Sequence, residues 1–368
     1  MIVADLQLSR VLRAVGAARG PLPPAPPSGR YVVRRPDDAA TARELARRAG
    51  HPAQVADGLV EALGSLRPWE RAHVLDPLRR TALDGDLPAA RPAPREAAAA
   101  ERPGAGSGPG PADGRFGEPL VLGSARAVQV DGTTCGSAVL AVLAAAGDPV
   151  VALWIVTGTD VSRGTSAHVV RQGEAGADAR ELETASGRFA ALQRLLKART
   201  TRAALGPLPW PGSLGTPPWT AARDARYADV RYTHRIATGD GGQDPVLAGA
   251  LRAAAAGVPV PLYTGGDVGT GWSTATPRHV VLLAGVSAGA GARPGDGHGQ
   301  DPTALDGRSC TVYEPSSGTL HRLRVADLLA VGEDGGPSKA VRRALGGWPH
   351  VTWALLPAGR AGGSRRVG

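Results

Sequence analysis

Residues 129–138 read Gln-Val-Asp-Gly-Thr-Thr-Cys-Gly-Ser-Ala and open an apolar run that continues to Ala146. The Asp131-Gly132 turn and the two threonines after it are typical of a helix start, so we predict a helix from Cys135 to Ala146. The run is apolar on nearly every side, which places this helix inside a domain rather than on its surface. One of only two cysteines in the chain therefore heads a buried helix.

A thiol in this position is suited to nucleophilic chemistry. The thiolate is the attacking form of cysteine, and the positive end of a helix dipole favours it. Gly136 lets a substrate approach the backbone closely. Gln129 can donate a hydrogen bond to the oxyanion that forms in acyl transfer, with the Cys135 N–H as second donor. The alternatives are an inert core cysteine and a surface glutamine.

His279 begins an apolar strand and needs a hydrogen-bond partner there. A thiol partner would make the ring a general base, whereas a carbonyl partner would leave only a satisfied core histidine. Glu314 ends the next strand and is the best candidate to orient the ring. If the Gly/Asp-rich loop 287–308 is set aside, the two strands form a hairpin that brings Glu314 beside His279. The alternatives are a solvated Glu314 and other carboxylates, namely Asp267 and Asp306.

This order of residues resembles that of the papain-like cysteine peptidases, and most closely the bacterial group similar to bacteriocin-leader-processing peptidases. In that family a glutamine six residues before the cysteine supplies the oxyanion hole. The cysteine heads a central buried helix, and the histidine and an Asp or Asn lie on the sheet that follows. The resemblance implies that Gln129 is the oxyanion residue, Cys135 the nucleophile and His279 the base. Glu314 stands where the family has Asp or Asn, often followed by proline.

The pattern of elements predicts an α+β fold, with helices before an antiparallel sheet. We expect a helical N-terminal segment over 1–85, a Pro/Ala/Gly-rich linker over 86–118 and a papain-like domain over 119–360. Within the first segment, residues 1–20 and 38–82 show helical periodicity. Further helices are expected at 150–157, 178–199 and 244–256, and a Pro/Gly/Trp-rich loop at 206–220. Strands are expected at 227–237, 258–264, 279–286, 310–313, 319–325 and 350–356. The prolines of 258–264 indicate an edge strand.

Composition limits the partners of this chain. The net charge of +9 at first favours nucleic-acid binding, but the basic residues are dispersed and almost all arginine, with lysine only at positions 197 and 339. We therefore expect no nucleic-acid partner. Neither a cleavable signal sequence nor an apolar run of membrane-spanning length is present, so we expect no membrane span and a cytoplasmic protein, although secretion without a cleaved signal stays compatible with the sequence.

The function that these residues predict is hydrolysis of a peptide or amide bond by a cysteine nucleophile, with a peptide or protein as substrate and no cofactor or metal. Deamidation or acyl transfer would use the same residues. A binding module that keeps the fold without activity is the non-enzymatic alternative. The sequence gives weaker support to two further features, a metal site at Asp296, His298 and Asp301 and a disulfide between Cys135 and Cys310. The tryptophans expected to form substrate walls are Trp210, Trp219 and Trp272.

Overall fold

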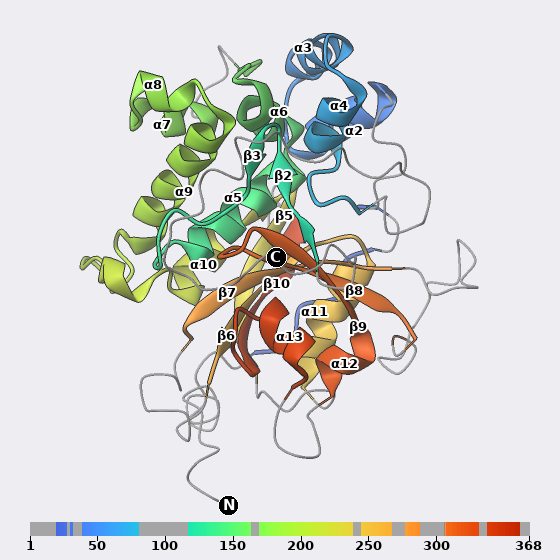
Figure 1. Ribbon diagram of the computed structural model, residues 1–368, viewed down its shortest axis with the longest axis vertical. Coiled ribbons are helices and arrows are strands. Elements are labelled where there is room, and N and C mark those ends of the chain that lie inside the picture. The colour runs from blue at the N-terminus through green and yellow to red at the C-terminus, as the bar shows by residue number, and fades with distance from the viewer. Residues whose placement is uncertain are drawn as a thin grey trace, which may run out of the picture.

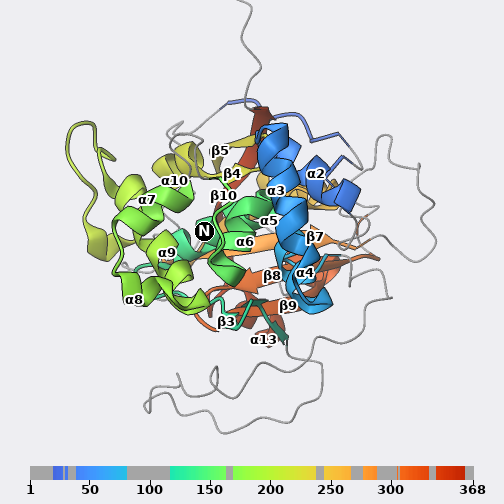
Figure 2. The same ribbon diagram turned by 90° about the horizontal axis from the view of Figure 1, so that it is seen from above.

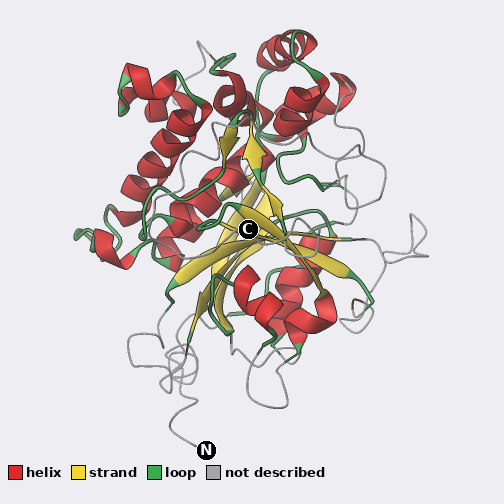
Figure 3. Ribbon diagram, viewed as in Figure 1, coloured by secondary structure: helices red, strands yellow, loops and turns green. Residues whose placement is uncertain are grey.

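The structure is a computed structural model of the 368-residue chain. It describes residues 20–27, 30–31, 39–80, 117–162, 169–237, 244–266, 277–287, 305, 307–330 and 337–360. In these residues the chain is a mixed α and β protein with an antiparallel sheet (Figures 1 and 3). The general class predicted from the sequence is therefore correct.

An eight-stranded sheet forms the middle of the molecule. Its order is β1-β9-β8-β7-β6-β10-β5-β4, and every neighbouring pair is antiparallel. The strands of this sheet are β1 (Glu118–Pro119), β4 (Arg226–Tyr227), β5 (Val230–Ile236), β6 (Val260–Gly265), β7 (His279–Val286), β8 (Ser309–Glu314), β9 (Thr319–Arg324) and β10 (His350–Arg360). A separate hairpin pairs β2 (Val121–Leu122) with β3 (Ala125–Arg126).

Helices cover both faces of this sheet (Figures 1 and 2). The larger group comprises α2 (Ala39–Arg48), α3 (Ala53–Gly64), α4 (Pro68–Leu75), α5 (Cys135–Gly147), α6 (Pro149–Thr157), α7 (Val169–Ala175), α8 (Ala179–Leu182), α9 (Ala185–Thr201) and α10 (Pro218–Asp224). The opposite face carries α11 (Pro245–Ala255), α12 (Val325–Leu329) and α13 (Lys339–Ala344). A short 3-10 helix, η4, spans Gly212–Leu214.

Alternation along the strands divides the core into two hydrophobic clusters. Val280 and Leu282 of β7 pack with α5, whereas Val281 and Leu283 pack with α11 on the other face. Successive side chains of a strand point to opposite faces, so one apolar strand supplies both clusters. For this reason β7 is apolar on both faces. Its one polar residue is the histidine at its start, His279.

The predicted helix at Cys135 is confirmed as α5, and twelve of its thirteen residues are buried. It packs on β7, on α9 and on α6 (Figure 2). The helix predicted at 150–157 is confirmed as α6, in which Asp148 caps the first turn by accepting from the Val150 N–H.

The N-terminal helices α2, α3 and α4 share the α5 side of the core. Leu59 and Leu78 belong to the same apolar cluster as Trp154 of α6. Two polar links reinforce this packing. His51 contacts Asp148 at 2.9 Å, and the buried Arg80 donates to the Gly257 carbonyl at 2.7 Å. Most of the predicted linker, residues 86–116, lies outside the described residues, as do residues 1–19 with their predicted helix.

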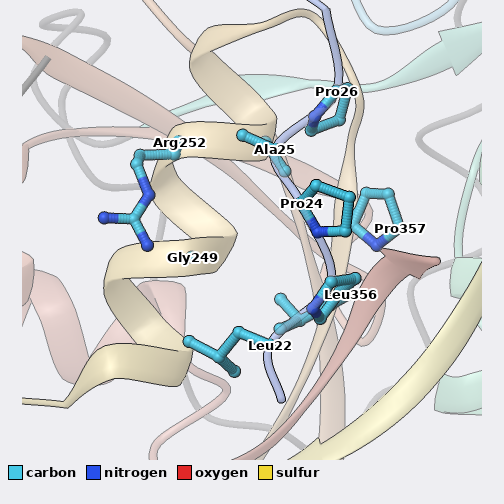
Figure 4. A pocket seen from close by; sticks show the side chains of 10 residues that line it. Leu22, Pro24, Ala25, Pro26, Gly249, Arg252, Leu356 and Pro357 are labelled. Carbon is cyan, nitrogen blue, oxygen red and sulfur yellow. The ribbon is translucent and has the colours of Figure 1, made fainter. Parts of the chain in front are cut away.

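Residues 20–27 follow an extended path along the outer side of α11 and the end of β10. Figure 4 shows Leu22, Pro24 and Pro26 facing Gly249 and Arg252 of the helix and Leu356 of the strand. The hollow that remains between them has a volume of about 30 Å³. This is room for about two water molecules, so the proline-rich segment occupies most of the groove.

Three predictions about secondary-structure elements were wrong. The prolines of 258–264 suggested an edge strand, but β6 lies between β7 and β10. Pro261 is tolerated because the pairing of β6 with β10 begins only at Leu262. The helix expected over 178–199 is broken into α8 and α9, and the hydroxyl of Thr184 caps α9 by accepting from the Gly187 N–H. The loop expected to reach residue 220 ends earlier, since α10 begins at Pro218.

In the described parts of the chain, no individual helix has both the length and the apolar composition of a membrane span. Helices α5 and α6 meet these criteria only as a pair that is bent by 111°.

Candidate active site

Cys135 is the first residue of α5, and a rigid turn leads into it. The Thr134 hydroxyl, at the N-cap position, donates to the Asp131 carbonyl and accepts from the Asp131 N–H, each at 2.9 Å. It therefore braces the turn and makes no side-chain cap to the helix. The N–H groups of the first helical turn keep their partial positive charge next to the thiol. Cys135 itself is 5% exposed.

His279 is brought to this helix by the sheet. It is the first residue of β7, the strand on which α5 packs, and it stands opposite Thr264 of β6. The backbone of Gly346, just after α13, lies against the ring. A Cβ at this glycine would lie 2.2 Å from Cδ2 and 2.6 Å from Nε2 of His279, and φ is +70° there. Glycine is thus required where the chain passes over the imidazole.

The imidazole of His279 bridges Cys135 and Glu314. Its Nε2 lies 2.8 Å from Oε1 of Glu314, and its ring is within hydrogen-bonding reach of the Cys135 side chain. Burial disfavours a charged ring, but the hydrogen bonds to Cys135 and to Glu314 outweigh it and raise the pKa of His279 to about 9. The ring therefore carries a proton at neutral pH, between a thiol and a carboxylate.

Glu314 is held as an ionised carboxylate by the turn that follows it. Oε1 accepts from the N–H and hydroxyl of Ser316, at 2.8 and 2.6 Å, and Oε2 accepts from those of Ser317, at 2.9 and 2.7 Å. Burial opposes the charge, but the hydrogen bonds from His279 and from the two serines lower the pKa of Glu314 to about 2. With Oε1 also bonded to the ring, both carboxylate oxygens are engaged.

The predicted hairpin relationship between His279 and Glu314 is therefore present in the structure. Leu282 of β7 pairs with Tyr313 of β8, so the neighbouring Glu314 lies on the His279 end of the strand pair. The proposed alternatives at Asp267 and Asp306 lie outside the described residues.

Gln129 lies beside the same turn. Its N–H donates to the carbonyl of Pro315 at 2.9 Å, which joins the segment before Cys135 to the turn after Glu314. Its side-chain Nε2 donates to the Asp131 carbonyl at 2.9 Å, and its Oε1 is buried with no hydrogen-bond partner among the described residues. One N–H of the amide is thus committed to the turn that leads into Cys135, and the other can serve a further acceptor.

Two side chains of α9 support this segment, and neither was singled out from the sequence. Gln193 is fully buried, accepts from the Val130 N–H and donates to the Val128 carbonyl, both at 3.1 Å. Lys197 contacts the Thr133 hydroxyl and lies 3.9 Å from the carboxylate of Asp131. The backbone on either side of Gln129 is therefore fixed by one glutamine. No local signal in the sequence singles out Gln193, because its burial depends on the packing of α9 against α5.

An apolar loop lies next to the start of α5. Thr216 packs on Gly136 so closely that a Cβ there would lie 2.7 Å from the threonine Cβ. The large apolar side chains that are exposed in the described residues come from this loop, from the start of α10 and from Val130: Leu205, Leu208, Leu214, Trp219 and Val130. Trp210 and Trp219 meet edge to face, with ring centroids 5.3 Å apart. Trp272 lies outside the described residues.

The remaining candidates do not join this site. Cys310 is a free thiol, as is Cys135, and it is fully buried in the cluster on the α11 face of the sheet. Burial raises the pKa of Cys310 to about 12. No group of three His, Cys, Asp or Glu residues in the described ranges is arranged to hold a metal ion. The metal site considered at Asp296, His298 and Asp301 falls outside those ranges.

Comparison of this chain with protein-family models, with curated proteins and with solved structures gave no match. We therefore infer the function from the site itself, that is, from the geometry and the chemistry of Cys135, His279, Glu314 and Gln129.

Proposed function

We propose that this chain is a cysteine-nucleophile hydrolase that cleaves a peptide or amide bond by thiol acyl transfer. The observation that carries the proposal is the imidazole of His279, which contacts the Cys135 side chain and has Nε2 2.8 Å from the Glu314 carboxylate. A nucleophile, a base and a group that orients the base are the three parts that such catalysis needs.

Acylation would begin with attack of the Cys135 sulfur on the carbonyl carbon of the substrate. The new S–C bond forms as the carbonyl π electrons move to oxygen, and the resulting oxyanion accepts hydrogen bonds from the Cys135 N–H and the free N–H of the Gln129 amide. When the oxyanion collapses, the C–N bond breaks and His279 gives its proton to the departing amine. The product is a thioester on Cys135.

Deacylation would return the enzyme to its starting state. His279, now neutral, accepts a proton from water as the water oxygen attacks the thioester carbon. The C–S bond then breaks, the acid leaves, and the thiolate and the protonated ring are restored. Glu314 stabilises the charged ring in both halves of the cycle, because its two oxygens are held by the turn of Ser316 and Ser317.

The arrangement also supports the proposal of a papain-like fold. A buried helix headed by cysteine packs on an antiparallel sheet, and two neighbouring strands of this sheet, β7 and β8, carry the histidine and the carboxylate. Glutamate replaces the shorter Asp or Asn of that family. The Ser316 and Ser317 contacts offer a physical account of the replacement, since they hold the longer side chain by both oxygens.

A catalytically inactive binding module is the second candidate. The observation that favours it is the low exposure of Cys135, together with the commitment of the Gln129 amide to the Asp131 carbonyl. Deamidation and transfer to an amine are variants of the first candidate, because they use the same thioester and differ only in the leaving group and the acceptor.

Selective alkylation distinguishes the two candidates. The protein is treated with iodoacetamide at pH 7, and modification is located by intact mass and peptide mapping. We expect rapid labelling of Cys135, loss of that rate in His279→Ala, and no labelling of Cys310 until the protein is unfolded. Reaction of Cys135 no faster than that of an unstructured thiol, or an equal rate in His279→Ala, would favour the binding module.

Peptide-library cleavage then tests the reaction itself. The wild-type chain should release new peptide termini that mass spectrometry detects, whereas Cys135→Ser should not. Conversion of glutamine to glutamate without cleavage would identify a deamidase, and incorporation of an added amine would identify a transferase.

A further inference from the structure

Tyr263 is a buried polar residue of the Cys135 cluster that the proposed mechanism does not use. It lies on β6, one residue before Thr264, which pairs with His279. The side chain is 3% exposed, and its hydroxyl has no hydrogen-bond partner among the described residues. A buried hydroxyl without a partner costs free energy, so its position calls for an explanation.

Strand alternation places Tyr263 on the face of the sheet that α5 covers. Tyr263 pairs with Val280 of β7, and paired residues point to the same face of the sheet. Both belong to the apolar cluster that contains Cys135, on the side of the sheet covered by α5. His279 and Thr264 are each one residue away along their strands. The phenol therefore lies on the face of the sheet that α5 and Cys135 cover, whereas His279 lies one residue further along β7, at the end of that strand.

The other buried tyrosines in the core show what an ordinary position looks like. Tyr313 donates its hydroxyl proton to the Ala127 carbonyl at 2.7 Å, and Tyr232 donates to the Pro259 carbonyl at 2.8 Å. An ordinary buried tyrosine therefore needs only one carbonyl oxygen within reach of its hydroxyl. The hydroxyl of Tyr263 has no such acceptor among the described residues. The nearby group that can become a strong acceptor is the sulfur of Cys135 in its thiolate form.

We propose that the Tyr263 hydroxyl is a hydrogen-bond donor to the Cys135 thiolate, and that it stabilises this ion from the side of the core. The inference rests on the proposed function, since it concerns the nucleophile of that reaction. The negative charge of the thiolate would attract the hydroxyl proton, which has no other acceptor among the described residues.

The electrostatics of the site agree with this role. Burial raises the pKa of Tyr263 well above its usual value, and the charge of Cys135 adds to the effect, so the phenol keeps its proton and remains a donor. The other charged groups around the thiol are His279 with Glu314 on the sheet, and Asp131 with Lys197 at the turn before the helix. Of these, only the imidazole is itself a hydrogen-bond partner of the Cys135 side chain.

The test compares Tyr263→Phe with Tyr232→Phe, a matched loss of one buried hydroxyl. Rates of alkylation of Cys135 by iodoacetamide are measured from pH 4 to 10, and stability is measured by urea unfolding. For Tyr263→Phe we expect the alkylation profile to move to higher pH by about one unit, because a hydrogen bond to a charged group is removed. Its urea midpoint should be equal to or above that of the wild type.

Tyr232→Phe should show the opposite pattern, with an unchanged alkylation profile and a lower urea midpoint. The inference would be overturned by an unshifted profile in Tyr263→Phe, or by a loss of stability as large as that of Tyr232→Phe. Fast, His279-dependent labelling of the wild type in that same experiment would show that the proposed function stands although the role of Tyr263 does not. Slow labelling of the wild type would overturn both.

Discussion

Nε2 of His279 and Oε1 of Glu314 lie 2.8 Å apart, although 35 positions separate the two residues. The contact sets the direction of the ring. Because Nε2 is engaged by the carboxylate, Nδ1 is the nitrogen left to face Cys135. In the proposed mechanism, Nδ1 is therefore the ring atom that exchanges a proton with Cys135.

The first prediction concerns the titration of His279. Hydrogen bonds to Cys135 and Glu314 stabilise the charged ring and place its pKa at about 9. Nuclear magnetic resonance of the protein with labelled histidine should show a ring that titrates near that value, and amide hydrolysis should decline as the pH rises through it. Glu314→Gln should lower the titration midpoint, because the charge that holds the proton is gone. A midpoint near 6.5 in the wild type would contradict the interaction.

The second prediction concerns acid stability. The pKa of Glu314 is about 2 in the folded chain against 4.5 for the free group, so the unfolded state binds the proton more readily. The stabilisation is complete above pH 4.5 and is lost as the pH falls towards 2, with a total of about 3 kcal/mol. Unfolding free energies at pH 6 and pH 3 should therefore differ more in the wild type than in Glu314→Gln. Equal differences in the two proteins would show that the carboxylate is not stabilised by its partners.

The third prediction concerns Gly346. An alanine there would place its Cβ 2.2 Å from the His279 ring, so the imidazole must move away from Cys135 and Glu314. We expect Gly346→Ala to abolish the fast alkylation of Cys135. Gly347→Ala is the control, because φ is also positive there, at +91°, and no atom lies within 4 Å of the new Cβ. Equal loss of reactivity in both variants would point to backbone strain rather than to displacement of the ring.

The geometry of these contacts explains which features the sequence could predict. The helix at Cys135 was predictable because its apolar run and turn signals are local. The approach of His279 to Glu314 followed from a second argument, that strands which are consecutive in the chain often pair. The order of the elements alone thus predicts that β7 and β8 are neighbours in the sheet, as the structure has them.

Other parts of the site depend on contacts that no local pattern encodes. Gly346 follows α13 and reaches His279 only because β10 returns to the middle of the sheet, beside β6. The prolines of 258–264 favour an edge strand, but Pro261 pairs only with β7, so β6 can be central although this residue has no N–H. Whether a proline or glycine is compatible with a position is decided by the partner strand, which the sequence does not show.

The last prediction concerns Gln193, the buried side chain that holds the backbone on both sides of Gln129. Gln193→Leu keeps a similar volume but leaves the Val130 N–H and the Val128 carbonyl without their partner. We expect a loss of about 2–3 kcal/mol in the free energy of unfolding, since buried polar groups are left unsatisfied. The same substitution at the exposed Gln54 of α3 should change the stability by less than about 0.5 kcal/mol. Alkylation of Cys135 should continue in Gln193→Leu, because the thiol and the imidazole stay in place. Amide hydrolysis should fall, because the backbone on both sides of Gln129, the proposed oxyanion donor, loses its support. Full hydrolytic activity in a destabilised Gln193→Leu would show that the amide of Gln129 needs no such support.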